Sequence, residues 1–365
     1  MSIESERTMK KNLLFLPFLA NELLDKIVRD LGLSDGLSLM QTCWMFHDIV
    51  ARVLYRVVAV SENDARRFFK TVAESKQHYG QYARALSYMA TSQMDVGLTY
   101  FLLCAAIPKM EYLRHLNLTV RSDLSPFLLH QFRTHSVIRS ALYSNGDPSS
   151  RVLPNLQKFT LHGDLALMDV VWHRTITSIS ITLPMSESSF TLFLDMATDE
   201  LKTNPLLREL GLVLRHSMGA KIVTHLNRVG FAFPNLRTLV VKIPSANALG
   251  ITASFAQSPP AFPCLRSFSL NNWSILCPIF VIAEDEALAQ QGSHIVKAGE
   301  IMQDLESLAF GTVRWSRKTY SSPWVVWKTP EYDIDDENLP RDFFDMPVFW
   351  DVVYHDPSRP LSNTV

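Results

Sequence analysis

The hydrophobic residues of this chain alternate with other residues in a short phrase that returns along most of its length. In each instance two apolar residues flank a third residue. Most instances have another apolar residue three positions before the first of the two. The phrases lie at residues 58–60, 86–88, 116–118, 159–161, 179–181, 210–212, 239–241, 268–270 and 308–310. Alternation with a period of two predicts a β-strand whose apolar side chains face one side. Recurrence at intervals of about 30 residues predicts a repeat architecture.

Helical patterns fill several of the intervals between these phrases. Residues 188–202 and 220–230 carry apolar residues at the spacing of an amphipathic helix. A strand followed by a returning helix gives parallel strands side by side, with the helices outside. Each unit buries its apolar face only against its neighbours, so we predict an α/β fold built as a curved solenoid. Longer intervals indicate insertions, and residues 142–150 have the composition of an exposed loop.

The pattern is helical in the first part of the chain. Asn21 is suited to cap a first helix that runs to Leu31. A second helix is predicted over residues 34–46 and a third over residues 49–55, again from apolar residues three and four apart. Three short helices have too little interior to bury all of these side chains. Part of their apolar surface should therefore face a partner or the next domain.

The repeats resemble the leucine-rich repeat, whose pattern is Leu-x-x-Leu-x-Leu-x-x-Asn. Leu113, Leu116 and Leu118 occupy the leucine positions in one of the repeats. The asparagine position is not matched, and it holds Arg121 and Asp164 in two of the repeats. The resemblance implies parallel strands inside and helices outside. Without the asparagine ladder we expect an irregular solenoid.

The helical segment before the repeats resembles the F-box. Residues 19–28 read Leu-Ala-Asn-Glu-Leu-Leu-Asp-Lys-Ile-Val, residues 37–39 read Leu-Ser-Leu, and residues 42–46 read Thr-Cys-Trp-Met-Phe. The F-box runs Leu-Pro-x-Glu-Leu-Leu-x-x-Ile, then Leu-x-Leu, then Val/Thr-Cys-x-x-Trp/Phe. The resemblance implies contact with a Skp-type adaptor, which bridges to a cullin-RING ligase. The implied adaptor contacts are Leu19, Ala20, Leu23, Ile27, Leu37, Leu39, Cys43 and Phe46.

Two positions depart from the F-box pattern. Ala20 replaces the proline, and Phe46 takes the place of the tryptophan. Loss of the proline removes a fixed turn, so we expect weaker docking rather than none. The alternative interpretation of this segment is a three-helix cap on the repeats that binds no ligase.

Three domains follow from these patterns: a helical F-box-like domain at residues 13–60, the repeat solenoid at 61–318 and a C-terminal segment at 319–365. The last segment breaks the period, is rich in aromatic residues and has an acidic run at residues 333–337. One interpretation is a cap over the exposed end of the solenoid. The other is a target-binding surface, because Trp and Tyr are enriched at interface hot spots.

In the leucine-rich-repeat family the concave sheet and its rim hold the ligand, which implies a target site among the residues between the strand leucines. Those singled out here are polar or basic: His115, Asn117, Lys158, Thr160 and His162. Such side chains suit hydrogen bonding to a protein partner.

Arginines recur in the repeats at one position. Arg208, Arg237 and Arg266 each follow the first leucine of a repeat at equal spacing, and Arg114 holds the same position earlier. Stacked repeats would align them, and aligned guanidinium groups fit an acidic or phosphorylated target. A row of this kind is also typical of a solvated edge.

Composition and charge bear on which classes of partner the chain favours. Hydrophobic residues make up 47% of the chain, and 35 basic residues balance 36 acidic ones. This balance offers no support for a nucleic-acid or a membrane partner. The four cysteines have neither zinc-site nor redox spacing, and we interpret them as buried thiols of a reducing compartment.

The N-terminus loosely imitates a signal peptide. An apolar run at residues 13–20 follows Lys10 and Lys11, but it is short, contains Pro17 and is not followed by a cleavage site. We therefore expect an intracellular protein, cytoplasmic or nuclear.

One motif favours an enzyme. Residues 215–219 read Arg-His-Ser-Met-Gly between a predicted strand and a predicted helix, the context of the nucleophile elbow, with Ser217 as the nucleophile of an α/β-hydrolase. Arg215 stands where that motif has a glycine, and His225, His294 and Asp304 lie at no diagnostic spacing. We expect no enzymatic activity, no catalytic residue, no cofactor and no metal.

The sequence therefore predicts the substrate-recognition subunit of an SCF-type ubiquitin ligase, with an unknown target protein. The alternative is a repeat scaffold that binds proteins without a ligase.

Overall fold

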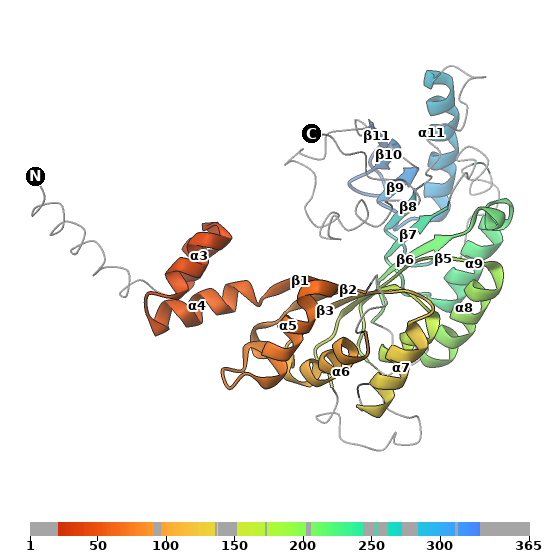
Figure 1. Ribbon diagram of the computed structural model, residues 1–365. Helices are drawn as coiled ribbons and strands as arrows, with labels where there is room; N and C mark the ends of the chain where they lie inside the picture. Colours follow the sequence, from red (N-terminus) through yellow and green to blue (C-terminus); the bar gives the residue numbers. More distant parts are fainter. Residues whose placement is uncertain are drawn as a thin grey trace, which may run out of the picture.

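The chain forms a mixed α/β structure with a helical N-terminal region and one large, mostly parallel sheet (Figure 1). The computed structural model describes residues 21–90, 96–135, 137, 152–171, 174–201, 206–243, 253, 262–271, 284–310 and 313–328. The predicted loop at residues 142–150 and the acidic run at residues 333–337 lie outside these ranges.

Three helices form the N-terminal region: α2 (Asn21–Asp30), α3 (Leu33–Met40) and α4 (Trp44–Leu54). They share a small core of their own, made of Leu24, Val28, Phe46, Ile49 and Val50. The first predicted helix is confirmed.

The predicted boundary between the second and third helices is wrong. A turn at residues 41–42 ends α3, and Cys43 is extended, so α4 begins at Trp44 and already contains Phe46. The hydroxyl of Thr42 donates to the main-chain oxygen of Leu39 at 2.7 Å and helps to close this turn. The apolar spacing runs on through the turn, which contains neither Gly nor Pro, so the pattern did not reveal the break.

The sheet has its strands in chain order from β1 to β11. The strands are β1 (Val57–Ser61), β2 (Ala85–Ala90), β3 (His115–Val120), β4 (Lys158–His162), β5 (Ser178–Met185), β6 (Glu209–Leu214), β7 (Thr238–Lys242), β8 (Ser267–Asn271), β9 (Ser307–Phe310), β10 (Val313–Ser316) and β11 (Val325–Lys328). Pairing is parallel from β1 to β9, and β10 and β11 are antiparallel.

Every predicted alternating phrase lies on a strand, and the phrases share one register. Their first apolar residues pair in sequence across the sheet: Val58, Leu86, Leu116, Phe159, Ile179, Leu210, Leu239, Phe268 and Leu308. Because side chains alternate along a strand, this register places the apolar residues of the repeats on one face.

Helices connect the strands and lie on that same side. They are α5 (Glu62–Glu74), α6 (Val96–Ala106), α7 (Ser125–Thr134), α8 (Glu187–Leu201), α9 (Ile222–Ala232) and α11 (Glu284–Ile301). Short 3-10 helices are η2 (Tyr79–Tyr82), η3 (Ile107–Lys109), η6 (Leu165–Val170) and η7 (His216–Lys221). Figure 1 shows α5, α6, α7, α8 and α9 side by side along the outer side of the sheet. The helices predicted at residues 188–202 and 220–230 correspond to α8 and α9. The interval between β4 and β5 is the shortest between the predicted strands, and it contains η6 instead of a longer helix.

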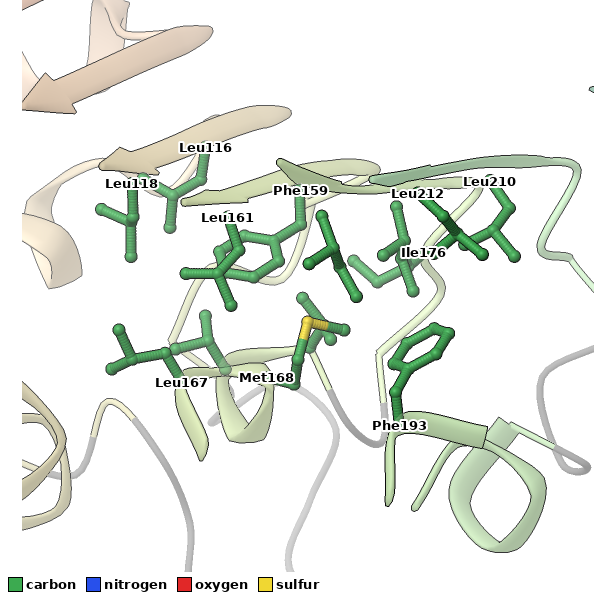
Figure 2. Close-up of a cluster of buried hydrophobic side chains, with 14 of the residues drawn as sticks. Leu116, Leu118, Phe159, Leu161, Leu167, Met168, Ile176, Phe193, Leu210 and Leu212 are labelled. Carbon is green, nitrogen blue, oxygen red and sulfur yellow. The ribbon is translucent and has the colours of Figure 1, made fainter. Parts of the chain in front are cut away.

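The main core lies between the sheet and these helices. In Figure 2 strand side chains such as Leu118 and Leu161 point toward Leu167 and Met168 of η6. Phe193 of α8 lies on the same side of the sheet, near Ile176. Each of these side chains is at most 1% exposed. Burial of such a side chain stabilises the fold by about 1.5–3 kcal/mol.

The C-terminal edge of the sheet is closed by a hairpin. β10 pairs with β9 and with β11, and the indole of Trp315 donates to Gln291 of α11 at 2.7 Å. The expected domain boundary between residues 318 and 319 falls between β10 and β11, which pair with each other.

Candidate binding surfaces

The N-terminal helices expose an apolar face that their own core does not use. Leu23 is 52% exposed, Ile27 41% and Leu37 44%. On α2, Leu24 and Val28 point into the core while Leu23 and Ile27, four residues apart, lie side by side on the outer face. The helix therefore buries one apolar stripe and presents another.

The remaining predicted adaptor contacts differ in exposure. Leu39 is half-buried against the helical core and Cys43 is exposed. Phe46 is only 7% exposed and packs inside that core. It therefore contributes to the packing of the helices and not to their exposed surface. Leu19 and Ala20 lie outside the described residues.

Trp44 is a further exposed apolar residue of the N-terminal helices, and it was not among the predicted adaptor contacts. Its side chain is 83% exposed, at the first position of α4 and next to Cys43. The sequence carried no signal for this exposure, because Trp44 and Phe46 are both aromatic and lie on the same helix, and packing in the helical core determines which of them is buried.

Aromatic side chains join the helical region to the sheet domain. The rings of Tyr55 and Tyr79 stack with centroids 4.7 Å apart, and Tyr55 also stacks on Phe68 of α5. The hydroxyl of Tyr82 donates to the Asp48 carboxylate at 2.5 Å. Contacts from α4 to η2 and β1, together with the Tyr55 stack, hold the helices against the first strands.

The predicted target residues lie on the polar face of neighbouring strands β3 and β4. His115 is exposed, and Asn117, Lys158, Thr160 and His162 are half-buried. Pairing places His115 opposite Lys158 and Asn117 opposite Thr160, so the structure brings these residues together.

Polar contacts hold several of these side chains in place. The amide of Asn117 donates to the hydroxyl of Ser87 at 3.1 Å, and Lys158 forms a 3.5 Å ion pair with Glu209 across the small Ser178. The Nδ1 atom of His162 lies 3.0 Å from the Thr182 hydroxyl. Burial lowers the pKa of His162, although a hydrogen bond with the backbone of Thr182 acts in the opposite direction, and the lowered pKa favours a neutral ring.

The predicted arginine row runs along the edge where the strands begin. The main-chain N–H of Arg237 donates to the oxygen of Arg208, and the N–H of Arg266 donates to the oxygen of Arg237, each at 2.8 Å. The alignment of these three residues is confirmed. Gln157 and Thr177 separate Arg114 from Arg208 in the same ladder.

Ser217 and His225, two of the residues considered for enzyme chemistry, do not hydrogen-bond to each other in the described part of the chain. Ser217 is exposed on η7, whereas His225 is 2% exposed on α9, and neither of its ring nitrogens has a hydrogen-bond partner in the described part of the chain. Among the described residues no group of three His, Cys, Asp or Glu side chains is placed to hold a metal ion.

The cysteines are free thiols where the structure describes them. Cys104 is buried, and burial raises the pKa of its thiol to about 12, which keeps it protonated. Cys43 is exposed at the start of α4, so the expectation that it is buried is wrong, while Cys264 is half-buried. Cys277 lies outside the described residues.

In the described part of the chain no helix has both the length and the apolar character required to cross a membrane. No protein-family model matches the sequence, and a search of curated proteins gave no match.

Proposed function

We propose that this protein is the substrate-recognition subunit of an SCF-type ubiquitin ligase. Its N-terminal helices dock a Skp-type adaptor, which bridges to the cullin and RING subunits. Its sheet domain is an irregular leucine-rich-repeat solenoid, and the polar face of that solenoid binds a target protein. The site of action is intracellular, in the cytoplasm, the nucleus or both.

The observation that carries this proposal is the second apolar stripe on the N-terminal helices. Leu23, Ile27 and Leu37 remain substantially exposed although the region has a closed core. Exposed aliphatic side chains on one small helical unit favour a protein partner. The order of residues 19–28, 37–39 and 42–46 agrees with the F-box, and Leu23, Ile27 and Leu37 occupy positions that contact the adaptor in that family.

Support for the repeat architecture comes from register. Strand pairing is one-to-one from Val58 through Leu116 to Leu308, with no strand out of chain order. Units that contact mainly their sequence neighbours are the physical basis of a solenoid.

The chemical contribution of such a subunit is proximity rather than catalysis. A target held on the sheet face brings its lysine near the ubiquitin thioester carried by the ligase complex, which raises the effective concentration of the reacting groups. The stacked Tyr55 and Tyr79 rings support this role, because they limit movement of the helices relative to the sheet.

Co-expression of the full chain with a Skp-type adaptor, followed by size-exclusion chromatography, tests the proposal. We expect a stable complex of one adaptor and one receptor chain. If the folded chain elutes alone, the helices are a cap on the repeats, and the protein is a binding scaffold outside the ligase.

A further inference from the structure

The first strand of the sheet has an open edge in the described part of the chain. β1 pairs with β2 on one side only, and Figure 1 shows it at the end of the sheet next to the N-terminal helices. Val57 is 70% exposed, and Ala59 and Ser61 are exposed as well. An edge strand presents main-chain N–H and C=O groups that its own sheet does not pair, so it is a template for a further strand.

The sequence of β1 has none of the features that commonly protect an edge strand. Residues 57–61 read Val-Val-Ala-Val-Ser, without a charge or a proline, and they pair with β2 in one unbroken register, without a bulge. The opposite edge strand, β11, contains Lys328, a residue type that often protects an edge. Valine favours the extended conformation, so β1 is suited to accept another strand.

The register with β2 determines which main-chain groups lie at the open edge. In a parallel pair, alternate residues of a strand turn their N–H and C=O groups toward the neighbouring strand. The oxygen of Arg56 accepts from the N–H of Ala85 at 3.1 Å. By this alternation the main-chain groups of Val58 and Val60 also face β2. The residues whose main-chain groups face outward are Val57, Ala59 and Ser61.

β1 is complementary to a second copy of itself when the two strands run antiparallel. A two-fold axis at Ala59 places this residue opposite its own equivalent, and residues 57 and 58 then lie opposite residues 61 and 60. All five residues of the strand are paired only in this register. Val58 packs against the main core and Val60 is part of it. The pairing therefore continues the apolar face of one sheet into the other, with valine opposite valine.

The charges at the two ends of β1 are complementary in the same arrangement. Arg56 directly precedes the strand and is exposed, and α5 directly follows it with Glu62 and Asp64 in its first turn. An antiparallel pair brings the arginine of each copy next to the acidic turn of the other copy. A parallel pair would instead place like charges together at both ends. Charge therefore favours the antiparallel pairing of two copies.

We propose that the chain forms a two-fold symmetric dimer in which the β1 strands of two copies pair antiparallel about Ala59. Pairing of one surface with its own copy closes the assembly at two chains. The contact between two short strands is small, so the dimer is reversible, with a dissociation constant in the micromolar range. Leu23 and Leu37 lie outside β1. An adaptor complex of this dimer would therefore contain two of each chain, in the same one-to-one ratio.

Sedimentation velocity of the full chain tests this interface. We expect a shift from monomer to dimer as the concentration rises from about 1 to about 100 μM. Ala59→Lys and Ala59→Glu each place like charges opposite each other across the axis. Each variant alone should therefore self-associate at least about tenfold more weakly than the wild type. An equimolar mixture of the two variants should recover the dimer, because a lysine then lies opposite a glutamate.

The matched control is Val325→Lys, which adds a charge to the opposite edge strand, where Val325 is 47% exposed. It should self-associate as the wild type does. All three variants should keep the wild-type melting temperature, because both positions are exposed. A wild-type chain that stays monomeric at about 100 μM would overturn the proposal and assign the open edge to a strand of another protein. Equal weakening by Val325→Lys, or no recovery in the mixture, would overturn the pairing about Ala59.

Discussion

At the residue scale, buried polar side chains show how single groups serve the fold. Arg317 is 8% exposed, and its guanidinium donates to the main-chain oxygens of Leu305, Gly299, Met302 and Gln303. Several of these oxygens belong to the last turn of α11 or follow it directly. A helix C-terminus carries partial negative charge, so it stabilises a buried cation, and the charge of Glu306 acts in the same direction.

Replacement of Arg317 by Met should therefore destabilise the C-terminal edge of the sheet. The change leaves several buried carbonyl groups without donors, and we expect a loss of about 3 kcal/mol in the free energy of unfolding. Urea denaturation followed by tryptophan fluorescence measures it. Lys318→Met, at an exposed neighbouring position, should change stability little; an equal effect of the two changes would refute this role of Arg317.

His225 makes the stability depend on pH. Its ring packs edge-on against Phe190 at 5.2 Å, and burial lowers its pKa, with Arg228 and Lys221 acting in the same direction against Glu187. The folded state thus resists protonation more than the unfolded state does. Stability should be complete above pH about 6.5 and should fall as the pH drops below that value.

The variant His225→Leu should reduce the loss of thermal stability between pH 7 and pH 5. Part of the loss should remain, because burial also lowers the pKa of His162. Differential scanning calorimetry at both pH values measures the effect. His130→Leu, at an exposed position on α7, should keep the wild-type pH dependence. Identical pH profiles for His225→Leu and the wild type would show that His225 is not responsible.

At the element scale, the close approach of η2 to η3 requires a glycine. A Cβ atom at Gly80 would lie 2.6 Å from the main-chain oxygen of Lys109 and 2.9 Å from its carbonyl carbon. Backbone atoms on both sides prevent an easy shift. We expect Gly80→Ala to lower the free energy of unfolding by about 1–3 kcal/mol.

Gly97 in α6 provides the control for that prediction. A Cβ there would lie 3.6 Å from the ring of Phe127, which is ordinary contact, so Gly97→Ala should be neutral or slightly stabilising. Chemical denaturation of both variants makes the comparison. Equal stability of the two variants would contradict the proposed packing of η2 on η3.

The parallel strands β1 to β9 could be predicted because each needs one feature, apolar residues at alternate positions, and the sequence repeats this feature; the antiparallel strands β10 and β11 lie outside the repeat and were not predicted. The helix boundary at Cys43 could not, since Gln41 and Thr42 form a turn without a residue typical of one. The sequence also did not reveal which aromatic side chain of α4 is exposed. Phe46 and Trp44 are both aromatic, and only packing against Leu24 and Ile49 determines which is buried.

The arginine row was predicted where a leucine precedes the arginine and missed elsewhere. Arg208, Arg237 and Arg266 follow Leu207, Leu236 and Leu265, whereas Arg56 follows Tyr55 and Arg84 follows Ala83. The ladder of main-chain hydrogen bonds, which depends on backbone position and not on residue type, places them in one row.

At the scale of the whole molecule, two hydrophobic cores are joined by aromatic contacts. The helical core contains Leu24 and Ile49, and the main core begins at Val60 and runs to Trp315. The Tyr55 and Tyr79 stack lies between them. This arrangement separates an apolar surface on the helices from a polar surface on the sheet, which fits the proposed role of connecting an adaptor to a target.

Titration of a purified Skp-type adaptor into the full chain, followed by calorimetry, tests the central claim most directly. The comparison uses Leu23→Asp on α2 and Leu192→Asp on α8, because these leucines are 52% and 54% exposed. Neither change should unfold the chain. The account predicts that the wild type and Leu192→Asp bind with equal affinity and that Leu23→Asp binds at least about tenfold more weakly. Equal binding by all three chains, or binding by none, would contradict it.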